Sequence, residues 1–210
     1  MLDSAQTPEG NTLRVIAGIA KGRKLLSVPG EGTRPITDRV KESLFDIIGA
    51  GIEDAAMLDL FAGTGGVGIE ALSRGARHVV LIDKAQQAVQ VLHKNLALTG
   101  LAGQATVIKG DAFRYLADPG AQRGFEYIYV APPQYIDLWA RALLALDEHD
   151  LLAEDGVIIV QIHPKEARPL ELQRFRLERE RRYGSTLLQF WVRREAPTAS
   201  VEGEADDGVR

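Results

Sequence analysis

The chain has 210 residues, 45% of them hydrophobic, and contains no cysteine. This length suits one globular domain with a small appendage, and the lack of cysteine excludes disulfides, thiolate catalysis and cysteine-ligated zinc. No apolar run approaches the roughly eighteen residues that a membrane helix needs. The polar stretch Met1 to Asn11 is typical neither of a signal peptide nor of a transit peptide. We therefore expect a cytoplasmic protein that binds neither a membrane nor a metal ion.

The net charge of −4 is unevenly distributed. Residues Glu195 to Arg210 hold five acids and one base, which account for all of it, and their composition predicts a disordered acidic tail. Elsewhere the bases gather in two stretches. Leu13 to Lys41 has seven bases against two acids, and Arg168 to Arg194 has eight against three. This segregation favours a polyanionic partner, although solvated faces of mixed sign are also common.

The amino-terminal part predicts a small β-hairpin followed by a helix. Leu13 to Ile19 and Lys24 to Val28 alternate like two short strands, and the connection between them carries a glycine and two bases. A helix capped by Thr37 or Asp38 then runs to about Ile48. The bases in its first turn oppose the helix dipole, which suggests that they serve a purpose other than helix stability.

The centre of the chain is a glycine-rich motif. Met57 to Ala62 predicts a short buried strand, and Gly63, Gly65 and Gly68 then give the G-x-G-x-x-G spacing that opens a helix over Val67 to Arg74. Such a loop lets the backbone approach a ligand closely at the carboxyl end of a parallel strand. The motif therefore predicts a nucleoside site.

Two acids indicate which ligand suits this loop. Asp59 lies inside the strand, where an apolar residue would be the default, and Asp83 closes the next predicted strand, His78 to Ile82. An acid at the second position accepts hydrogen bonds from both ribose hydroxyls of a nucleoside. A carboxylate beneath the loop would repel the pyrophosphate of a dinucleotide, but it suits the sulfonium and ammonium groups of S-adenosylmethionine. The sequence therefore predicts S-adenosylmethionine as the cofactor.

The rest of the body alternates between strand and helix. The predicted elements are a helix over Ala85 to Leu98, strands over Ala105 to Lys109 and Tyr127 to Val130, a helix ending near Asp147, and a strand over Val157 to Ile162. This order predicts an α/β fold with an open, mostly parallel sheet and helices on both faces. Phe175 to Tyr183 and Thr186 to Arg193 then predict an antiparallel hairpin with a type II′ turn at Gly184 and Ser185. A terminal hairpin favours the Rossmann-like class I methyltransferase variant of this fold.

Asp111 follows the third predicted strand, beside Phe113. An acid in this place can hold an adenine amino group while the ring packs against the adenine face. It can also cap the short helix that follows, and Asp111 can do both.

A chemical step is suggested by Ala131-Pro132-Pro133-Gln134-Tyr135, which follows the fourth predicted strand and should face the same crevice as the glycine loop. The prolines remove two N–H donors and leave carbonyls free to accept hydrogen bonds. Tyr135 offers a flat ring on which a flipped base can stack. Rigid acceptors beside an aromatic ring suit methyl transfer to an exocyclic amine.

Several of these stretches also carry a family resemblance. They are Leu13 to Gly18, Gly22 to Leu25, Thr33 to Phe45, Asp59 to Gly65 and Gly68 to Ala76. In these stretches the chain resembles the RsmD family of bacterial 16S ribosomal RNA guanine-N2 methyltransferases, over Leu13 to about Leu188. The resemblance implies cofactor contacts at Asp59, Gly63, Gly65, Asp83 and Asp111. It also implies RNA contacts from the basic amino-terminal segment.

The expected site has three groups of residues. The cofactor group is Asp59, Phe61, Gly63, Thr64, Gly65, Asp83, Asp111 and Ala112. The methyl-transfer group is Ala131, Pro132, Pro133, Gln134 and Tyr135. The RNA group is Arg14, Lys21, Arg23, Lys24, Arg34 and Arg39.

The expected domain organisation has four parts: a flexible start (1–12), an RNA-contacting extension made of the hairpin and helix (13–50), a methyltransferase domain (51–194) and the disordered tail (195–210). We expect a monomer that acts on 16S rRNA, either free or in an assembling small ribosomal subunit.

One departure from the family leaves the chemistry open. The family's fourth motif is usually Asp or Asn, then Pro-Pro, then Tyr or Phe, but here Ala131 stands at the acid position and Gln134 is inserted. The Ala131 carbonyl and the Gln134 amide oxygen can replace the carboxylate, which we favour although an amide is the weaker acceptor. Alternatively, Asp137 swings in, or the protein binds cofactor and RNA with little or no catalysis.

Two other functions therefore stay open. A non-catalytic assembly factor would bind S-adenosylmethionine and rRNA without transferring a methyl group. A DNA amino-methyltransferase shares both motifs, but it normally carries a target-recognition region for which this chain has no room between Pro133 and Arg194.

Overall fold

The structure, a computed structural model, describes residues 13–28 and 36–195. The predicted flexible start (1–12), the RNA-group residue Arg34 and nearly all of the predicted acidic tail lie outside these residues. In chain order the elements are α1 (Asp38–Ile48), β1 (Ala56–Asp59), α2 (Gly66–Ser73), β2 (His78–Asp83), α3 (Gln86–Thr99), β3 (Ala105–Lys109), α4 (Ala112–Leu116), β4 (Phe125–Val130), α5 (Leu138–His149), β5 (Leu152–Ile162), β6 (Phe175–Tyr183) and β7 (Thr186–Arg193), with short 3-10 turns at Gly49–Ile52, Ala102–Gln104 and Pro164–Glu166. Among the described helices, none is long and apolar enough to cross a membrane.

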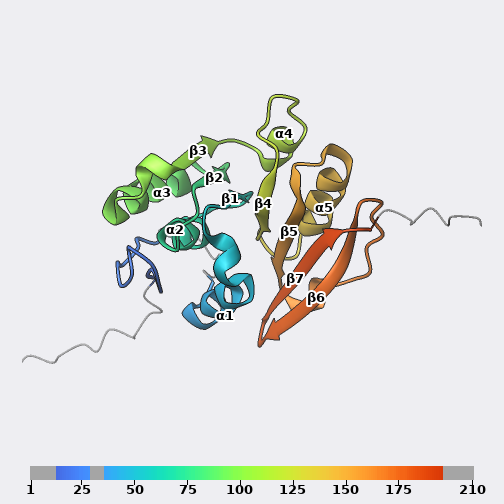
Figure 1. Cartoon of the computed structure of the whole chain (residues 1–210), viewed down its shortest axis with the longest axis horizontal. Coiled ribbons are helices and arrows are strands. Elements are labelled where there is room, and N and C mark those ends of the chain that lie inside the picture. The colour runs from blue at the N-terminus through green and yellow to red at the C-terminus, as the bar shows by residue number, and fades with distance from the viewer. Residues whose placement is uncertain (1–12, 29–35, 196–210) are drawn as a thin grey trace, which may run out of the picture.

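The strands form one sheet in the order β3-β2-β1-β4-β5-β7-β6 (Figure 1). Strands β1 to β5 run parallel to their neighbours, whereas β7 lies antiparallel between β5 and β6. The predicted mostly parallel sheet with a carboxyl-terminal hairpin is confirmed. The strand order reverses between β1 and β4, and a sheet of this kind opens its ligand crevice at that point.

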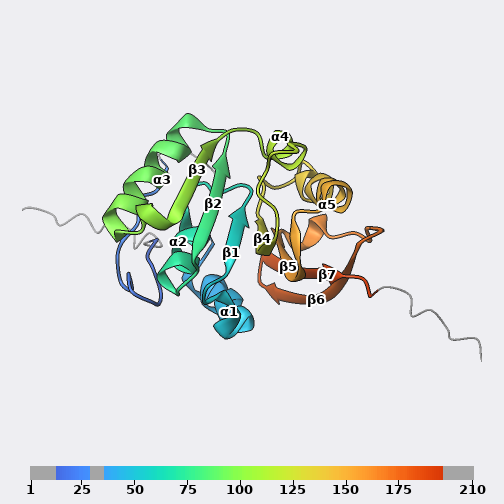
Figure 2. The same ribbon diagram turned by 45° about the horizontal axis from the view of Figure 1, so that its top comes forward.

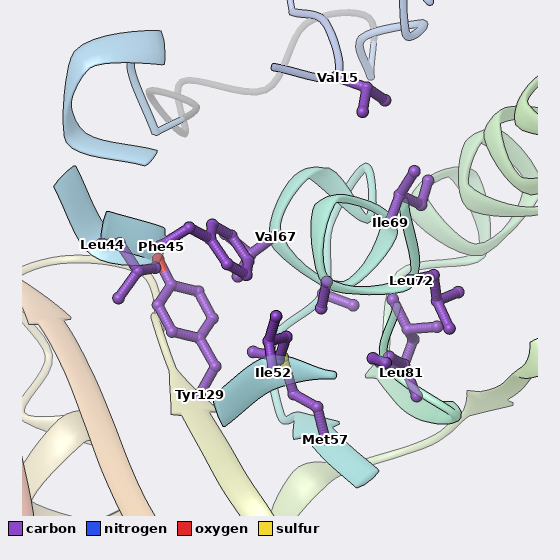
Figure 3. Close-up of a cluster of buried hydrophobic side chains, with 14 of the residues drawn as sticks. Val15, Leu44, Phe45, Ile52, Met57, Val67, Ile69, Leu72, Leu81 and Tyr129 are labelled. Carbon is purple, nitrogen blue, oxygen red and sulfur yellow. The ribbon is translucent and has the colours of Figure 1, made fainter. Parts of the chain in front are cut away.

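Helices cover both faces of this sheet: α1, α2 and α3 lie on one side, and α4 and α5 on the other (Figure 2). Successive strand residues point to opposite faces. Met57 and Tyr129 therefore join a hydrophobic cluster with α1 and α2, whereas Leu58 and Ile128 join a second cluster with α5. Figure 3 shows part of the first cluster, in which the Tyr129 ring lies close to Phe45 of α1.

The predicted amino-terminal hairpin is wrong as a pair of regular strands. Neither 13–19 nor 24–28 is a strand, and a single antiparallel bridge joins Arg14 to Lys24. The predicted helix after it is confirmed, with Thr37 as its cap. The amino-terminal extension is therefore a looped segment that leads into α1.

Backbone hydrogen bonds join the two arms of this segment, from Val15 to Arg23 (3.0 Å) and from Leu25 to Leu13 (2.8 Å), and helix α2 holds the turn between them. Gly18 has a φ of 81°, a left-handed conformation that turns the chain against α2, and a Cβ at this position would overlap the backbone carbonyl of Ser73. Ser73 accepts hydrogen bonds from two backbone N–H groups of the turn, one on its carbonyl oxygen (2.8 Å) and one on its hydroxyl (2.9 Å). The close approach that glycine permits is what fixes the segment to the helix.

A buried ion pair fastens α1 to α2 as well. Lys41 and Glu70 are fully buried, and Lys41 Nζ lies 3.3 Å from Glu70 Oε2. Glu70 also accepts hydrogen bonds from Arg74 Nε (2.9 Å) and from the backbone N–H groups of Ile16 (2.8 Å) and Ala17 (2.9 Å). Burial lowers the pKa of the Lys41 ammonium, while the charge of Glu70 raises it. Lys41, in the first turn of α1, therefore helps to hold α1 against α2.

Strand β5 begins earlier than predicted. It starts at Leu152 instead of Val157, because the chain stays extended through the turn-like sequence Glu154-Asp155-Gly156. Helix α5, for which only an end near Asp147 was predicted, starts at Leu138, after the left-handed residue Asp137 (φ 54°).

Candidate active site

A cavity of about 640 Å³ lies at the carboxyl ends of the parallel strands. Its wall includes the last residue of β1, Asp59, the last residue of β2, Asp83, and residues that follow β3 and β4. The volume falls in the range of small-molecule binding pockets. The amino-terminal segment closes one side with Leu13, Ser27 and Val28, so this segment is part of the cavity wall.

The structure brings most of the predicted cofactor group to this cavity. The residues that line it are Asp59, Phe61, Gly63, Thr64, Asp83, Asp111 and Ala112. Gly65 of the same group does not line it. Of the methyl-transfer group, Ala131 and Pro133 line the cavity, and Pro132, Gln134 and Tyr135 do not. The described members of the RNA group, Arg14, Lys21, Arg23, Lys24 and Arg39, lie away from its wall.

The glycine loop requires glycine for two different reasons, one conformational and one steric. Gly63 (φ 53°) and Gly65 (φ 79°) adopt left-handed conformations, which turn the chain from β1 into α2. A Cβ at Gly68 would lie 2.7 Å from Leu81 Cδ2, so glycine there lets α2 pack closely on β2. The space beside Gly63 is open, with no heavy atom within 4 Å of a Cβ built on it. A ligand can therefore approach the loop at Gly63.

Asp59 is an unusual residue for a buried strand. Its side chain is 2% exposed, and Oδ1 has no hydrogen-bond partner within the described protein. Burial raises the pKa of the Asp59 carboxyl from 3.8 to about 7, against hydrogen bonds from the backbone of Phe61 and Gly68, and the charge of Asp83 raises it further. An unpaired buried carboxylate is costly, and a cationic ligand group beside it would remove that cost.

Asp83 ties the glycine loop to the end of β2. Its Oδ2 accepts a hydrogen bond from the Gly63 N–H (2.8 Å), and its Oδ1 accepts one from the Ala85 N–H (2.8 Å). Each carboxylate oxygen has a second lone pair. The half-buried carboxylate is thereby held at a fixed orientation and keeps the capacity to accept two hydroxyl groups from a ligand.

Asp111 is the amino-terminal cap of α4, accepting hydrogen bonds on Oδ1 from the N–H groups of Phe113 (2.9 Å) and Arg114 (3.1 Å). The capping interpretation is confirmed. Phe113 also lines the cavity and contacts Phe61 edge to face, with ring centroids 6.4 Å apart. The guanidinium of Arg141 lies 4.4 Å from the Phe113 centroid and lines the same wall. Together these side chains form an aromatic and cationic part of the cavity wall, against which a planar ring can pack.

The loop after β4 directs its tip away from the cavity. Gln134 is exposed, and the Tyr135 side chain is 65% exposed, on a left-handed backbone (φ 64°). The Tyr135 N–H donates to Glu166 Oε1 (2.7 Å), and its ring centroid lies 5.6 Å from that of His163. Asp137 is paired with an arginine, 2.9 Å away. The rim of the site is thus fastened to the segment that follows β5.

A polar pair that the sequence did not single out lies behind Ala131. The Tyr129 hydroxyl donates to Gln161 Oε1 (2.6 Å), and both residues line the cavity. Tyr129 stands opposite Asp59 in the β1–β4 pairing. Burial raises the pKa of Tyr129 well above its ordinary value, and the charge of Asp59 adds to the shift. The available signal in the sequence was that Gln161 is polar within the otherwise apolar run Val157 to Ile162 of β5.

Comparison with known proteins gives a consistent result. The family model described as "Conserved hypothetical protein 95" matches residues 13–192. YlbH of Bacillus subtilis (strain 168) is 42% identical over 185 residues, which are 87% of this chain and 100% of YlbH. "Ribosomal RNA small subunit methyltransferase D" of Escherichia coli (strain K12) is 36% identical over 194 residues, 92% of this chain and 93% of that protein. The solved structure of yhhF from Escherichia coli has a TM-score of 0.77 and 35% identity, covering 87% of this chain and 98% of yhhF.

Proposed function

We propose that this chain, which belongs to the family described as "Conserved hypothetical protein 95", transfers a methyl group from S-adenosylmethionine to the exocyclic N2 of a guanine in 16S rRNA. The membership and the relatives' names support rRNA methylation by an enzyme of the methyltransferase class. The observation that carries the proposal is the cavity in which a buried, unpaired Asp59 and the fixed Asp83 meet across a glycine loop.

The residues of this cavity fit S-adenosylmethionine. Asp59 would face the cationic groups of the methionine part, because its Oδ1 has no partner within the described protein. Asp83 would accept the ribose hydroxyls, and Phe61, Phe113 and Arg141 would enclose the adenine. Asp59 would also oppose the pyrophosphate of a dinucleotide, so the same wall disfavours NAD.

The chemistry needs acceptors for the two N–H groups of the target amine. When bound, S-adenosylmethionine supplies a methyl group on a sulfonium, whose carbon–sulfur bond breaks as the carbon–nitrogen bond forms. The amine nitrogen becomes more acidic as it attacks and then loses a proton to solvent. Acceptors on the protein localise its lone pair and stabilise the charge that develops.

We assign these acceptors to the Ala131 carbonyl and to Gln161 Oε1. Both residues line the cavity, and an amide oxygen that already accepts from Tyr129 has a second lone pair for the substrate. Gln134, the acceptor favoured on sequence grounds, is exposed and outside the cavity wall, and Asp137 is engaged with an arginine. Gln161 therefore takes the role that an acid fills in the related motif.

The substrate would approach over the rim formed by the Pro-Pro loop. Tyr135 is exposed there, and a flipped base can stack on it. The amino-terminal extension (13–50) would contact RNA phosphates through Lys21, Arg23, Lys24 and Arg39, which are exposed, whereas Arg14 is paired with Asp38 (2.8 Å). We further propose a cytoplasmic monomer that acts on 16S rRNA, free or within an assembling small subunit.

The alternative favoured by one observation is a factor that binds cofactor and rRNA without transfer. Ala131 carries no carboxylate, and an amide acceptor lacks charge assistance. The difference is about one to a few kcal/mol, which slows a reaction without forbidding it. A DNA amino-methyltransferase finds no support, because α5 and β5 to β7 take up most of the described residues from Pro133 to Glu195 and leave little room for a target-recognition region.

Mass spectrometry of nucleosides tests the proposal in the host. Small-subunit rRNA from cells that lack the gene should lose one N2-methylguanosine relative to cells that have it. The same level of that nucleoside in both would contradict the proposed reaction.

A further inference from the structure

We propose that the edge strand β6 carries a second RNA-binding surface, made of Arg179 and Arg181, which holds the phosphate backbone beside the target base. The inference rests on the proposed function for its ligand. It does not depend on the amino-terminal bases, because their segment lies beside α2, far from the edge strand β6 (Figure 1).

Strand register connects this surface to the cavity. Arg181 of β6 stands opposite Leu188 of β7, and Leu188 stands opposite Gln161 of β5. Residues opposite one another share a face of the sheet, and strands are about 4.8 Å apart. The Arg181 backbone is therefore about 10 Å from that of Gln161, on the same face. A side chain of arginine's length spans much of that distance.

The turn of the hairpin lies at the same end of the sheet as the active site. Leu187, next to the turn, pairs with Ile162, the last residue of the parallel strand β5. Arg181 and Arg182 immediately precede the turn and Tyr183, whereas Arg176 lies near the opposite end, across from Val192. Arg181 therefore lies at the same end of the sheet as the cavity.

These arginines are available for a ligand, in contrast to others in the same basic stretch. Arg193 is held by Asp150 at 2.6 Å, and Arg168 pairs with Asp137 at 2.9 Å. Arg174 and Arg194 donate to backbone carbonyls that close the segment before β6. Arg181 and Arg182 also donate to backbone carbonyls, but only to those of near neighbours in the chain, Glu180 (3.0 Å) and Gly184 (3.3 Å). Arg179, Arg181 and Arg182 are exposed and have no carboxylate within 4.0 Å among the described residues.

The acids on β6 do not cancel this charge. The Glu180 carboxylate accepts a hydrogen bond from buried Gln189 (2.7 Å), on the opposite face from Arg179 and Arg181. Glu178 lies in the register shift between Leu177 and Arg179, 3.9 Å from Arg176. Both acids are therefore directed to neighbours other than the proposed phosphate contacts.

Charged edge strands also protect a sheet from pairing with another chain, so the test separates binding from protection. The probe is a transcript of the host 16S rRNA, titrated with protein over a series of salt concentrations. The variant Arg179→Gln/Arg181→Gln should bind more weakly at low salt. Its slope of log affinity against log salt should be shallower by about 1.4 to 1.8, the contribution of two phosphate contacts.

Two matched variants make the result specific. Arg176→Gln removes one arginine charge, 3.9 Å from Glu178, at the far end of the same strand and should leave the slope unchanged. Arg179→Lys/Arg181→Lys keeps the charge and should retain the wild-type slope even if the glutamine variant folds poorly. S-adenosylmethionine affinity, measured by calorimetry, should be the same in all of these variants.

The outcomes distinguish this surface from the proposed reaction. An unchanged salt slope in the glutamine variant, whether or not the variant aggregates, would overturn the proposed RNA-binding surface. The arginines of β6 would then only protect the edge of the sheet from pairing with another chain. The same loss of slope in Arg176→Gln would also overturn it, because the effect would then be one of net charge. A wild type that binds rRNA with the expected slopes but transfers no methyl group would contradict the proposed reaction and leave this surface intact.

Discussion

At the scale of single residues, Asp59 links stability to function. Its pKa of about 7 in the folded protein lies above the value of 3.8 expected when unfolded. Between these values the folded state binds a proton that the unfolded state has released, so stability falls as the pH rises from about 4 to 7. Asp59→Asn should therefore raise the free energy of unfolding at pH 8, by at most about 4 kcal/mol, and change it little below pH 4. Urea unfolding at both pH values measures this, and an equal effect at the two would contradict it.

The same carboxyl should control cofactor affinity. Only the ionised form of Asp59 attracts a sulfonium or an ammonium group, so affinity for S-adenosylmethionine should fall as the pH drops from 8 to 6. Calorimetry across this range measures the effect. Asp59→Asn should bind more weakly at pH 8, and its affinity should lose most of the pH dependence that wild type shows. A parallel pH profile in the two proteins would mean that Asp59 does not face the cationic groups.

Gln161 and Gln134 offer a direct comparison of two acceptors. Gln161→Ala should slow single-turnover methyl transfer about 10- to 100-fold, because it removes one hydrogen bond that strengthens in the transition state. The same variant should bind RNA and cofactor as wild type does. Gln134→Ala should have little effect, because its side chain is exposed outside the cavity. Adding Ala131→Asp to Gln161→Ala should restore transfer. If Gln134→Ala slowed methyl transfer more than Gln161→Ala, Gln134 would be the acceptor of the amine proton.

At the scale of elements, Glu70 decides whether the amino-terminal segment stays attached to α2. Glu70→Ala would leave the buried Lys41 ammonium without its partner, together with two backbone N–H groups of the segment. The expected loss of stability is about 3–5 kcal/mol. Denaturant unfolding measures the loss, and limited proteolysis should show earlier cleavage within 13–28. Arg77→Ala, which removes a half-exposed pair with Glu126, is the control and should cost less than about 1 kcal/mol.

The sequence predicted elements well where a local pattern decides them. The sheet strands and the capped helix α1 follow from alternation, helical spacing and a threonine cap. The amino-terminal strands could not be excluded from sequence, because the alternation from Leu13 is real. The competing partner, α2, is distant in the chain and contributes Ser73 and Glu70 only after folding.

At the scale of the whole molecule, the cofactor side of the site could be predicted from the sequence more completely than the substrate side. The cofactor side is encoded in short motifs, and the Gly63–Asp83 hydrogen bond joins two of them as their spacing suggests. The substrate side depends on the pairing of β4 with β5, which puts Gln161 beside Ala131. Side-chain direction in the loop after β4 depends on the left-handed conformation of Tyr135, a conformation that non-glycine residues seldom adopt.

The central claim is methyl transfer, and one measurement tests it most directly. Purified protein, S-adenosylmethionine carrying an isotopic label on its methyl group, and unmodified small-subunit rRNA from the host are incubated, and the labelled nucleoside is identified by mass spectrometry. The expected result is label in N2-methylguanosine at one position of the 16S rRNA. Label in another nucleoside, or no label despite tight binding of both ligands, would contradict the proposed reaction, and the second result would identify a binding factor.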